Sequence, residues 1–264
     1  MEVLEITLGQ VFLSEAVGSM LLLLLGGGVV ANTLLKGTKG QGTGWLLINW
    51  GWGLAVFVGV LASGASGAHI NPAVTVGIIA RNSMMGEPDF IEGAIPISIV
   101  STLVYFAGQL LGAMIGAGLM WLSYKQHFDA EENKAFKLGV FSTGPEIRSY
   151  GWNLVTEIIG TFVLVFTIFA AGYYANTQAE GGPVNLGWLG ALGVALLVVS
   201  IGISLGGPTG YAINPTRDLG PRIMHSLLPI KGKGTSDWGY SWVPIVGPLI
   251  GGVLGGVAST FLLV

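Results

Sequence analysis

The sequence has no cysteine and few charged residues. Without cysteine there can be no disulfide, no thiolate metal ligand and no cysteine nucleophile. The 11 Lys and Arg and the 14 Asp and Glu residues make up 9% of the 264 residues, whereas an ordinary soluble domain has about 25%. Because so few charges cannot cover a water-facing surface, we expect much of the surface to face lipid. The net charge of -3 provides no basic face, which excludes nucleic acid as a partner.

The sequence also lacks the motifs of common enzymes. No phosphate-binding glycine-rich loop opens a soluble helix, and neither a His-Glu-x-x-His motif nor a Ser, His and Asp set in a suitable context is present. We therefore predict neither an enzyme nor a bound cofactor or metal. Glycine, in contrast, is abundant: its 44 copies lie mostly within apolar runs, where small residues let transmembrane helices pack closely. Glycines at four-residue spacing predict contact faces within the protein or between subunits, at Gly112, Gly116, Gly247, Gly251 and Gly255.

Six long apolar runs dominate the chain. Each is near 20 residues long with almost no charge, which is enough for a helix to cross a hydrocarbon core of about 30 Å. The sequence therefore predicts an all-α membrane protein with six transmembrane helices. The predicted spans are 8 to 31, 45 to 65, 96 to 122, 152 to 174, 186 to 206 and 241 to 263.

Two shorter apolar stretches, residues 71 to 81 and 214 to 227, begin with Asn-Pro. Asn is a good helix N-cap and Pro suits the first helical position, so each pair predicts the start of a helix. At 1.5 Å per residue such helices would cover roughly half of the hydrocarbon core. We therefore predict two re-entrant half-helices. Two surface turns are the alternative, because Asn-Pro is also common in loops.

The chain contains an internal duplication. Residues 15–19 (Glu-Ala-Val-Gly-Ser) match residues 157–161 (Glu-Ile-Ile-Gly-Thr) at an offset of 142, and residues 67–73 match residues 210–216 at an offset of 143. Because each half has three spans, an odd number, the second half must enter the membrane from the opposite side. We thus predict one channel domain made of inverted repeats, approximately 8–122 and 150–264, linked by a loop at 123–149.

Inverted half-helices enter from opposite faces, so their N-termini at Asn71 and Asn214 are expected to meet near the midplane. Both helix dipoles would point their positive ends at that place, and each Asn side chain can offer an N–H donor. A cation would be repelled there, a neutral hydrogen-bond acceptor would be guided through, and an oriented water column would interrupt proton hopping. The repeat therefore predicts a passage for uncharged polar solutes.

Four ionisable residues are predicted to lie at membrane depth. A buried charge in a membrane is costly, so we assign Arg217 a functional role; the alternatives are a side chain that reaches the interface or pairs with Asp218. The repeat-related Glu15 and Glu157 are expected to accept N–H groups from the irregular backbone before each half-helix, rather than to carry protons. His69 is expected to support its loop by hydrogen bonding, rather than to act as a gate.

The two Asn-Pro segments resemble a known pair of signatures. Residues 66–74 (Ser-Gly-Ala-His-Ile-Asn-Pro-Ala-Val) and 214–222 (Asn-Pro-Thr-Arg-Asp-Leu-Gly-Pro-Arg) are similar to the Asn-Pro-Ala motifs of the major intrinsic proteins, which comprise aquaporins and glycerol facilitators. Asp218, directly after the signature arginine, marks the aquaglyceroporin branch. The resemblance covers the whole chain. It implies an aquaporin-like right-handed bundle, passive conduction of glycerol and water, and a homotetramer in the plasma (inner) membrane with cytoplasmic termini.

The resemblance also implies a selectivity filter beyond the Asn pair. Its members would be Arg217, Gly202, Tyr211 and one residue of the second span. An ungapped count gives Gly51 for that last position, whereas the family's aromatic pattern gives Trp50, which we prefer. Tyr211 stands where glycerol channels usually have Phe, so it would add a hydroxyl to an apolar wall, and Gly202 would leave space opposite.

Two other questions stay open at the level of sequence. Eight basic residues lie on one side of a six-span topology and only Arg81 on the other, which by the positive-inside rule would put the termini outside, contrary to the resemblance. The solute is also undecided among glycerol, water alone and a neutral acid such as lactic acid. An ion-coupled secondary transporter is the rival from another class, because it too can use inverted repeats with broken helices.

Overall fold

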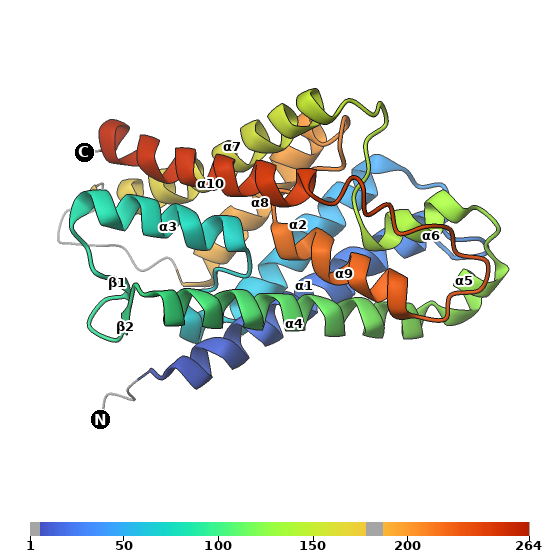
Figure 1. The fold of residues 1–264 in the computed structure, drawn as a ribbon, viewed down its shortest axis with the longest axis horizontal. Coiled ribbons are helices and arrows are strands. Elements are labelled where there is room, and N and C mark those ends of the chain that lie inside the picture. The colour runs from blue at the N-terminus through green and yellow to red at the C-terminus, as the bar shows by residue number, and fades with distance from the viewer. Residues whose placement is uncertain (1–5, 178–186, 264) are drawn as a thin grey trace.

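The computed structural model describes residues 6–177 and 187–263. In these residues the chain forms a helical bundle with one small β-hairpin (Figure 1). Six helices are long and apolar enough to cross a membrane, which confirms the six predicted spans. They are α1 (Leu8–Leu34), α2 (Trp45–Ala62), α4 (Ile99–Ser123), α7 (Tyr150–Thr177), α8 (Trp188–Leu205) and α10 (Val243–Leu262).

Two shorter helices, α3 (Pro72–Met85) and α9 (Pro215–Leu227), begin directly after the two Asn residues. The Asn71 side chain accepts a hydrogen bond from Ala73 N at 2.9 Å, and the Asn214 side chain accepts one from Thr216 N at 3.1 Å, so both residues are N-caps. The alternative of two surface turns is therefore wrong. The two helices lie end to end and run in opposite directions from the middle of the bundle (Figure 1).

The two ends of the bundle carry different connections. The start of α1 and the end of α10 lie at one end, together with the antiparallel hairpin of β1 (Asp89–Ile91) and β2 (Ile95–Pro96) (Figure 1). The opposite end carries α5 (Lys125–Ala130) and α6 (Lys134–Phe141). A single 3-10 turn, η1 (Gly64–Ser66), precedes the first Asn-Pro segment.

The glycines at four-residue spacing form helix contacts within the chain. A Cβ on Gly112 of α4 would overlap the backbone of Ala16 in α1, and one on Gly251 of α10 would overlap the backbone of Ile158 in α7. α1 thus packs closely on α4, and α7 packs closely on α10. These glycine faces are accordingly filled by the protein's own helices and are not available to a neighbouring subunit.

The linker between the halves contains more structure than the sequence predicts. We expected a polar loop at 123–149, but α5 and α6 occupy much of it. Asn133 caps α6 by accepting from Ala135 N at 2.9 Å, and Phe128, Val140 and Phe141 are buried in the core. α6 packs on α1 and α9 and thereby brings the following residues, Ser142 and Thr143, next to the second half-helix.

Candidate solute passage and selectivity site

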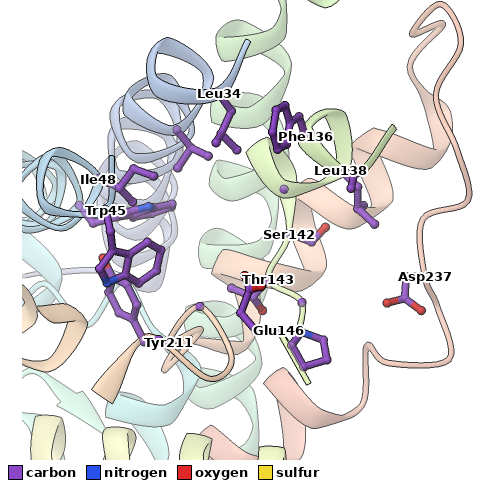
Figure 2. Close-up of a pocket in the computed structure, with 18 of the residues that line it drawn as sticks. Leu34, Trp45, Ile48, Phe136, Leu138, Ser142, Thr143, Glu146, Tyr211 and Asp237 are labelled. Atoms are coloured by element: carbon purple, nitrogen blue, oxygen red, sulfur yellow. The ribbon is translucent and has the colours of Figure 1, made fainter. Parts of the chain in front are cut away.

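Two cavities lie along the bundle and share part of their lining. The larger one, here called the vestibule, has a volume of about 730 Å³ and opens among α2, α6 and the loop after α6 (Figure 2). The smaller one, here called the central cavity, has a volume of about 200 Å³ and is lined by both Asn-Pro segments. Trp52, Tyr211 and Arg217 line both cavities. We call these three residues the junction, because any solute that moves between the cavities must pass them.

The two Asn side chains lock the half-helices to each other across the central cavity. Asn71 Nδ2 donates to Ile213 O at 2.8 Å, and Asn214 Nδ2 donates to Ile70 O at 2.8 Å. Each side-chain oxygen is occupied by its own helix N-terminus. An Asn amide has two N–H groups, so each residue keeps a second donor, and both residues line the central cavity. The arrangement provides paired donors between two helix N-termini.

The backbone that leads into each half-helix has an unusual conformation. Ala68 and Ile70 have φ values of 57° and 43°, and the repeat-related Tyr211 and Ile213 have values of 37° and 42°. A positive φ is rare for non-glycine residues and is a true outlier for a β-branched one. Such strain persists only where the surrounding structure holds it, and it often marks a functional site.

The two repeat glutamates hold this strained backbone. Glu15 accepts from His69 N at 2.9 Å and Ile70 N at 2.7 Å, while Glu157 accepts from Ala212 N at 3.0 Å and Ile213 N at 2.9 Å. Both residues are at most 1% exposed, and neither lines the vestibule or the central cavity. These contacts match the support role expected from the sequence and leave neither carboxylate in contact with a passing solute.

His69 supports its loop and also touches the central cavity. Its Nδ1 lies 3.1 Å from Thr75 Oγ1, and its ring stacks on Tyr105 at a centroid distance of 4.2 Å. Phe90 of β1 packs edge-on against the same ring at 5.5 Å. The second repeat has Ala212 at the corresponding place, so this aromatic cluster belongs to the first half alone.

Arg217 is buried at the junction and forms no ion pair with a carboxylate of the described residues. Its residue exposure is 8%, its Cζ lies 4.0 Å from the centroid of the Trp52 ring, and its Nη1 has no hydrogen-bond partner among residues 6–177 and 187–263. The alternative in which Arg217 pairs with Asp218 is wrong, because Asp218 pairs with another arginine. The guanidinium is thus a fixed, positively charged donor group beside the passage.

Asp218 instead forms a buried ion pair with Arg222. Arg222 Nε donates to Asp218 Oδ1 at 2.7 Å, and neither side chain is exposed. Asp218 also accepts from Thr143 N at 2.8 Å, while Arg222 donates to Ser236 O at 2.7 Å and Thr143 O at 2.9 Å. Asp218 therefore has a supporting position: this network ties α9 to the loops on both sides of the vestibule.

The assignment of Trp50 to the filter is wrong. Its side chain is 45% exposed and lines neither cavity, and a Cβ on the alternative residue, Gly51, would overlap the side chain of Val29 in α1. Trp52 is the residue of α2 that lines the junction instead. A helix turns by about 100° per residue, so Trp50 lies on the opposite side of α2 from Trp52. The cavity-lining residues of α2 recur at helical spacing, at Trp45, Ile48, Trp52, Val56 and Val60, and Trp50 does not belong to this series.

Tyr211 and Gly202 also differ from the expectation. The Tyr211 hydroxyl oxygen is buried, so the wall at the junction presents the apolar ring and not the hydroxyl. Gly202 does not line either cavity. A Cβ at Gly202 would overlap the Tyr211 ring, so the absence of a side chain there makes room for Tyr211 and not for solute.

The vestibule combines aromatic and charged groups. Figure 2 shows Trp45 and Tyr211 together on one side and Asp237 on the other, with the loop after α6 between them. Arg148 binds Asp237 through two hydrogen bonds, of 3.1 Å and 2.5 Å. This interaction raises the pKa of the Arg148 guanidinium, mainly through the hydrogen bond to Asp237. Both residues line the vestibule, so an ion pair is part of its wall.

Comparison with known proteins agrees with this geometry. The major intrinsic protein family matches residues 2–259. The chain belongs to this family. It is 52% identical over 247 residues to the "Probable glycerol uptake facilitator protein" of Thermotoga maritima (93% of this chain, 96% of the relative). It is also 50% identical over 241 residues to the glycerol uptake facilitator protein of Streptococcus pneumoniae (91% and 94%).

A solved structure gives the same result for the fold. The aquaglyceroporin from Plasmodium falciparum superimposes with a TM-score of 0.77 at 31% identity, covering 95% of this chain and 94% of that one. The chain is therefore a multi-pass membrane protein of the major intrinsic protein family, with the aquaporin-like fold that the resemblance implied. Members of this family are channels and not enzymes, so an enzymatic role is excluded.

Proposed function

We propose that this major intrinsic protein conducts glycerol passively, together with water and similar small uncharged solutes, and excludes ions and protons. The observation that carries the proposal is the guanidinium of Arg217, which stacks on Trp52 where the vestibule meets the central cavity and whose Nη1 has no partner in the described residues. The names of the relatives in Thermotoga maritima and Streptococcus pneumoniae support glycerol as the solute.

Glycerol suits a passage with two kinds of wall. A three-carbon polyol has carbon hydrogens along one side and hydroxyls along the other. The rings of Trp52 and Tyr211 can contact the first side, and the guanidinium of Arg217 can donate to the second. Moving a hydroxyl out of water without a partner costs about 1 to 3 kcal/mol on protein-derived scales, so these donors are needed for entry. An anion such as lactate would have to lose more hydration, whereas the neutral acid could pass.

The exclusion of cations follows from the charges beside the passage. A cation would meet the Arg217 guanidinium at the junction and then the N-termini of α3 and α9 in the central cavity. The two Asn donors would orient water oppositely on their two sides, which interrupts proton transfer.

An ion-coupled transporter would need a titratable group that a solute can reach and that changes between two states. Glu15 and Glu157 are bonded to the backbone and line neither cavity. The His69 ring touches the central cavity but is held by Thr75 Oγ1 and stacked on Tyr105, which favours a supporting role.

We further infer the setting in which the channel works. The order of two long helices, a half-helix and a long helix occurs twice, in agreement with inverted repeats at about 8–122 and 150–264. The family implies a homotetramer in the plasma membrane, with one passage in each subunit, and cytoplasmic termini. The basic residues of the connection at 123–149 favour the opposite orientation, so the cytoplasmic termini proposed here rest on the family alone.

Swelling of proteoliposomes in stopped-flow measurements tests the proposed solute. We expect rapid, non-saturating glycerol flux, measurable water flux, and lactate flux only at a pH where the neutral acid is present. Empty liposomes give the background. Water flux without glycerol flux would overturn the assignment of glycerol, and a dependence on an ion gradient would indicate a transporter.

A further inference from the structure

Asn49 is a buried polar residue that the proposed passage does not use. It lies in the second turn of α2, has 0% exposure, and donates from Nδ2 to Trp45 O at 2.8 Å. Its Oδ1 is also buried and has no hydrogen-bond partner in the described part of the chain. An unsatisfied buried acceptor costs free energy, and such groups are rare enough in folded proteins that each requires an explanation.

The orientation of the Asn49 amide is fixed by its neighbours. Trp45 O is an acceptor, so the atom that faces it must be the N–H₂ group. A flipped amide would put two acceptors against each other. The free oxygen of Asn49 therefore points away from Trp45 O, and it needs a donor.

The Tyr211 hydroxyl is the second unsatisfied group at the same place. Tyr211 is 5% exposed, and its hydroxyl oxygen is buried without a partner in the described residues. The ring carbon that bears this hydroxyl and Asn49 Oδ1 would both overlap a Cβ on Gly202. A hydroxyl can donate one hydrogen bond, and the amide oxygen can accept one. Because both side chains reach the same point, an adjustment of the ring brings donor and acceptor together.

We propose that Asn49 Oδ1 accepts a hydrogen bond from the Tyr211 hydroxyl in the working channel, and that Asn49 is thereby a positioning residue for the junction. The bond keeps the hydroxyl behind the wall, so that the solute meets only the apolar ring face. Trp45 supports the ring from another side, since its ring packs edge-on against Tyr211 at 5.7 Å and its Nε1 donates to Gly202 O at 3.2 Å. The functional part of this inference rests on the proposed conduction of glycerol.

A double-mutant cycle in proteoliposomes tests the proposal, with the ratio of glycerol flux to urea flux as the readout. Asn49→Leu removes the acceptor at similar volume, so the Tyr211 hydroxyl can turn into the passage and favour urea; we expect the ratio to fall about threefold or more. Tyr211→Phe removes the hydroxyl, so the ratio measured for this variant is the reference against which the effect of Asn49→Leu in the double variant is read. The double variant should behave like Tyr211→Phe. The proposal would be overturned if Asn49→Leu lowered the ratio of glycerol flux to urea flux equally in the wild type and in Tyr211→Phe, or if it lowered the ratio in neither.

A second variant and a second measurement cover the case in which Asn49→Leu does not insert. In Asn49→Ser the serine hydroxyl can still bond the carbonyl four residues earlier. The serine side chain is too short to accept a hydrogen bond from the Tyr211 hydroxyl, so we expect the same fall in the ratio of glycerol flux to urea flux. Thermal unfolding in detergent is independent of the solute: either Asn49 variant should lower the melting temperature, and Tyr211→Phe should reduce that loss. If the changes in melting temperature of the two single variants add up to the change in the double variant, the hydrogen bond between Asn49 and Tyr211 does not exist. Absence of glycerol flux in the wild type would refute the proposed function while leaving the melting cycle informative.

Discussion

Trp52 and Trp50 are a matched pair of residues, because they lie on the same helix but face different surroundings. Trp52 lines both cavities and stacks on Arg217, whereas Trp50 is 45% exposed on the outer side of α2. We expect Trp52→Ala to widen the junction and to raise the flux of a five-carbon polyol relative to glycerol about tenfold, equivalent to roughly 1.4 kcal/mol. Trp50→Ala should leave this ratio unchanged. Swelling assays on both variants measure it, and the reverse pattern would restore the original assignment of Trp50.

Arg217 is the residue whose loss should change both solute and ion selectivity. Arg217→Val removes the donors at the junction, and each unpaired solute hydroxyl then costs about 1 to 3 kcal/mol, so the preference for glycerol over an apolar solute of similar size should fall roughly 5- to 150-fold. Proton or cation leak should rise, because the positive charge is lost. Swelling and a pH-sensitive dye inside the liposomes report the two effects. If neither changes in correctly inserted protein, Arg217 does not line the passage.

For single residues, the sequence predicts those that belong to a local motif better than those whose position depends on packing. Asn71, Asn214 and Arg217 belong to contiguous motifs, so a reader of the sequence can find them. Trp52 depends on the rotation of α2 about its axis, which the packing of α1 and α8 determines. The burial of the Tyr211 hydroxyl likewise depends on Gly202, which is nine residues away on another element. Neither fact is encoded by neighbours in sequence.

The half-helix α9 contains a fully buried ion pair. Its Asp218–Arg222 pair has no exposure and connects the half-helix to the loops at 142–149 and 236–242. Removing one partner of a buried pair typically costs about 3 to 5 kcal/mol, because the other charge is left unpaired. We therefore expect Arg222→Met to lower the melting temperature strongly in detergent, and Asp218→Leu combined with Arg222→Met to be less destabilised than the single variant. A double variant that is worse than the single one would contradict this account.

The elements differ in how well the sequence predicts them. The starts of α3 and α9 are determined by Asn and Pro at the cap and first turn, which act locally, and the structure has them at the predicted residues. α5 and α6 have only six and eight residues. Helices this short are not stable in isolation, so their formation depends on packing against α1 and α9, which no local pattern in a charged segment reveals.

For the whole molecule, the absence of cysteine makes the proposed topology directly testable. Lys39 lies in the exposed α1–α2 connection at the α5 and α6 end, and Glu92 lies in the exposed hairpin at the other end. With cytoplasmic termini, Lys39→Cys should react with a membrane-impermeant thiol reagent in intact cells, and Glu92→Cys should react only after lysis. The cysteine-free parent is the control. The opposite labelling pattern would support the orientation given by the count of basic residues.

The proposed assembly is a second property of the whole molecule. Because the glycine faces of α4 and α10 are filled within the chain, contacts between subunits must use other helix surfaces. We expect native mass spectrometry in mild detergent to give a tetramer mass. Cross-linking in membranes should agree. A stable monomer that conducts at the full rate would show that each passage works without assembly.

The reciprocal bonds from Asn71 to Ile213 O and from Asn214 to Ile70 O have a consequence for how flux depends on temperature. Each half of the molecule is fastened to the other at the centre of the passage, so the halves cannot rock apart without breaking both bonds. A carrier must reorganise its fold once for every molecule moved, and its rate therefore climbs steeply on warming. In this protein we expect the solute to move while the surrounding helices stay in place. The Arrhenius slope of glycerol flux should accordingly be shallow, close to that of diffusion through water.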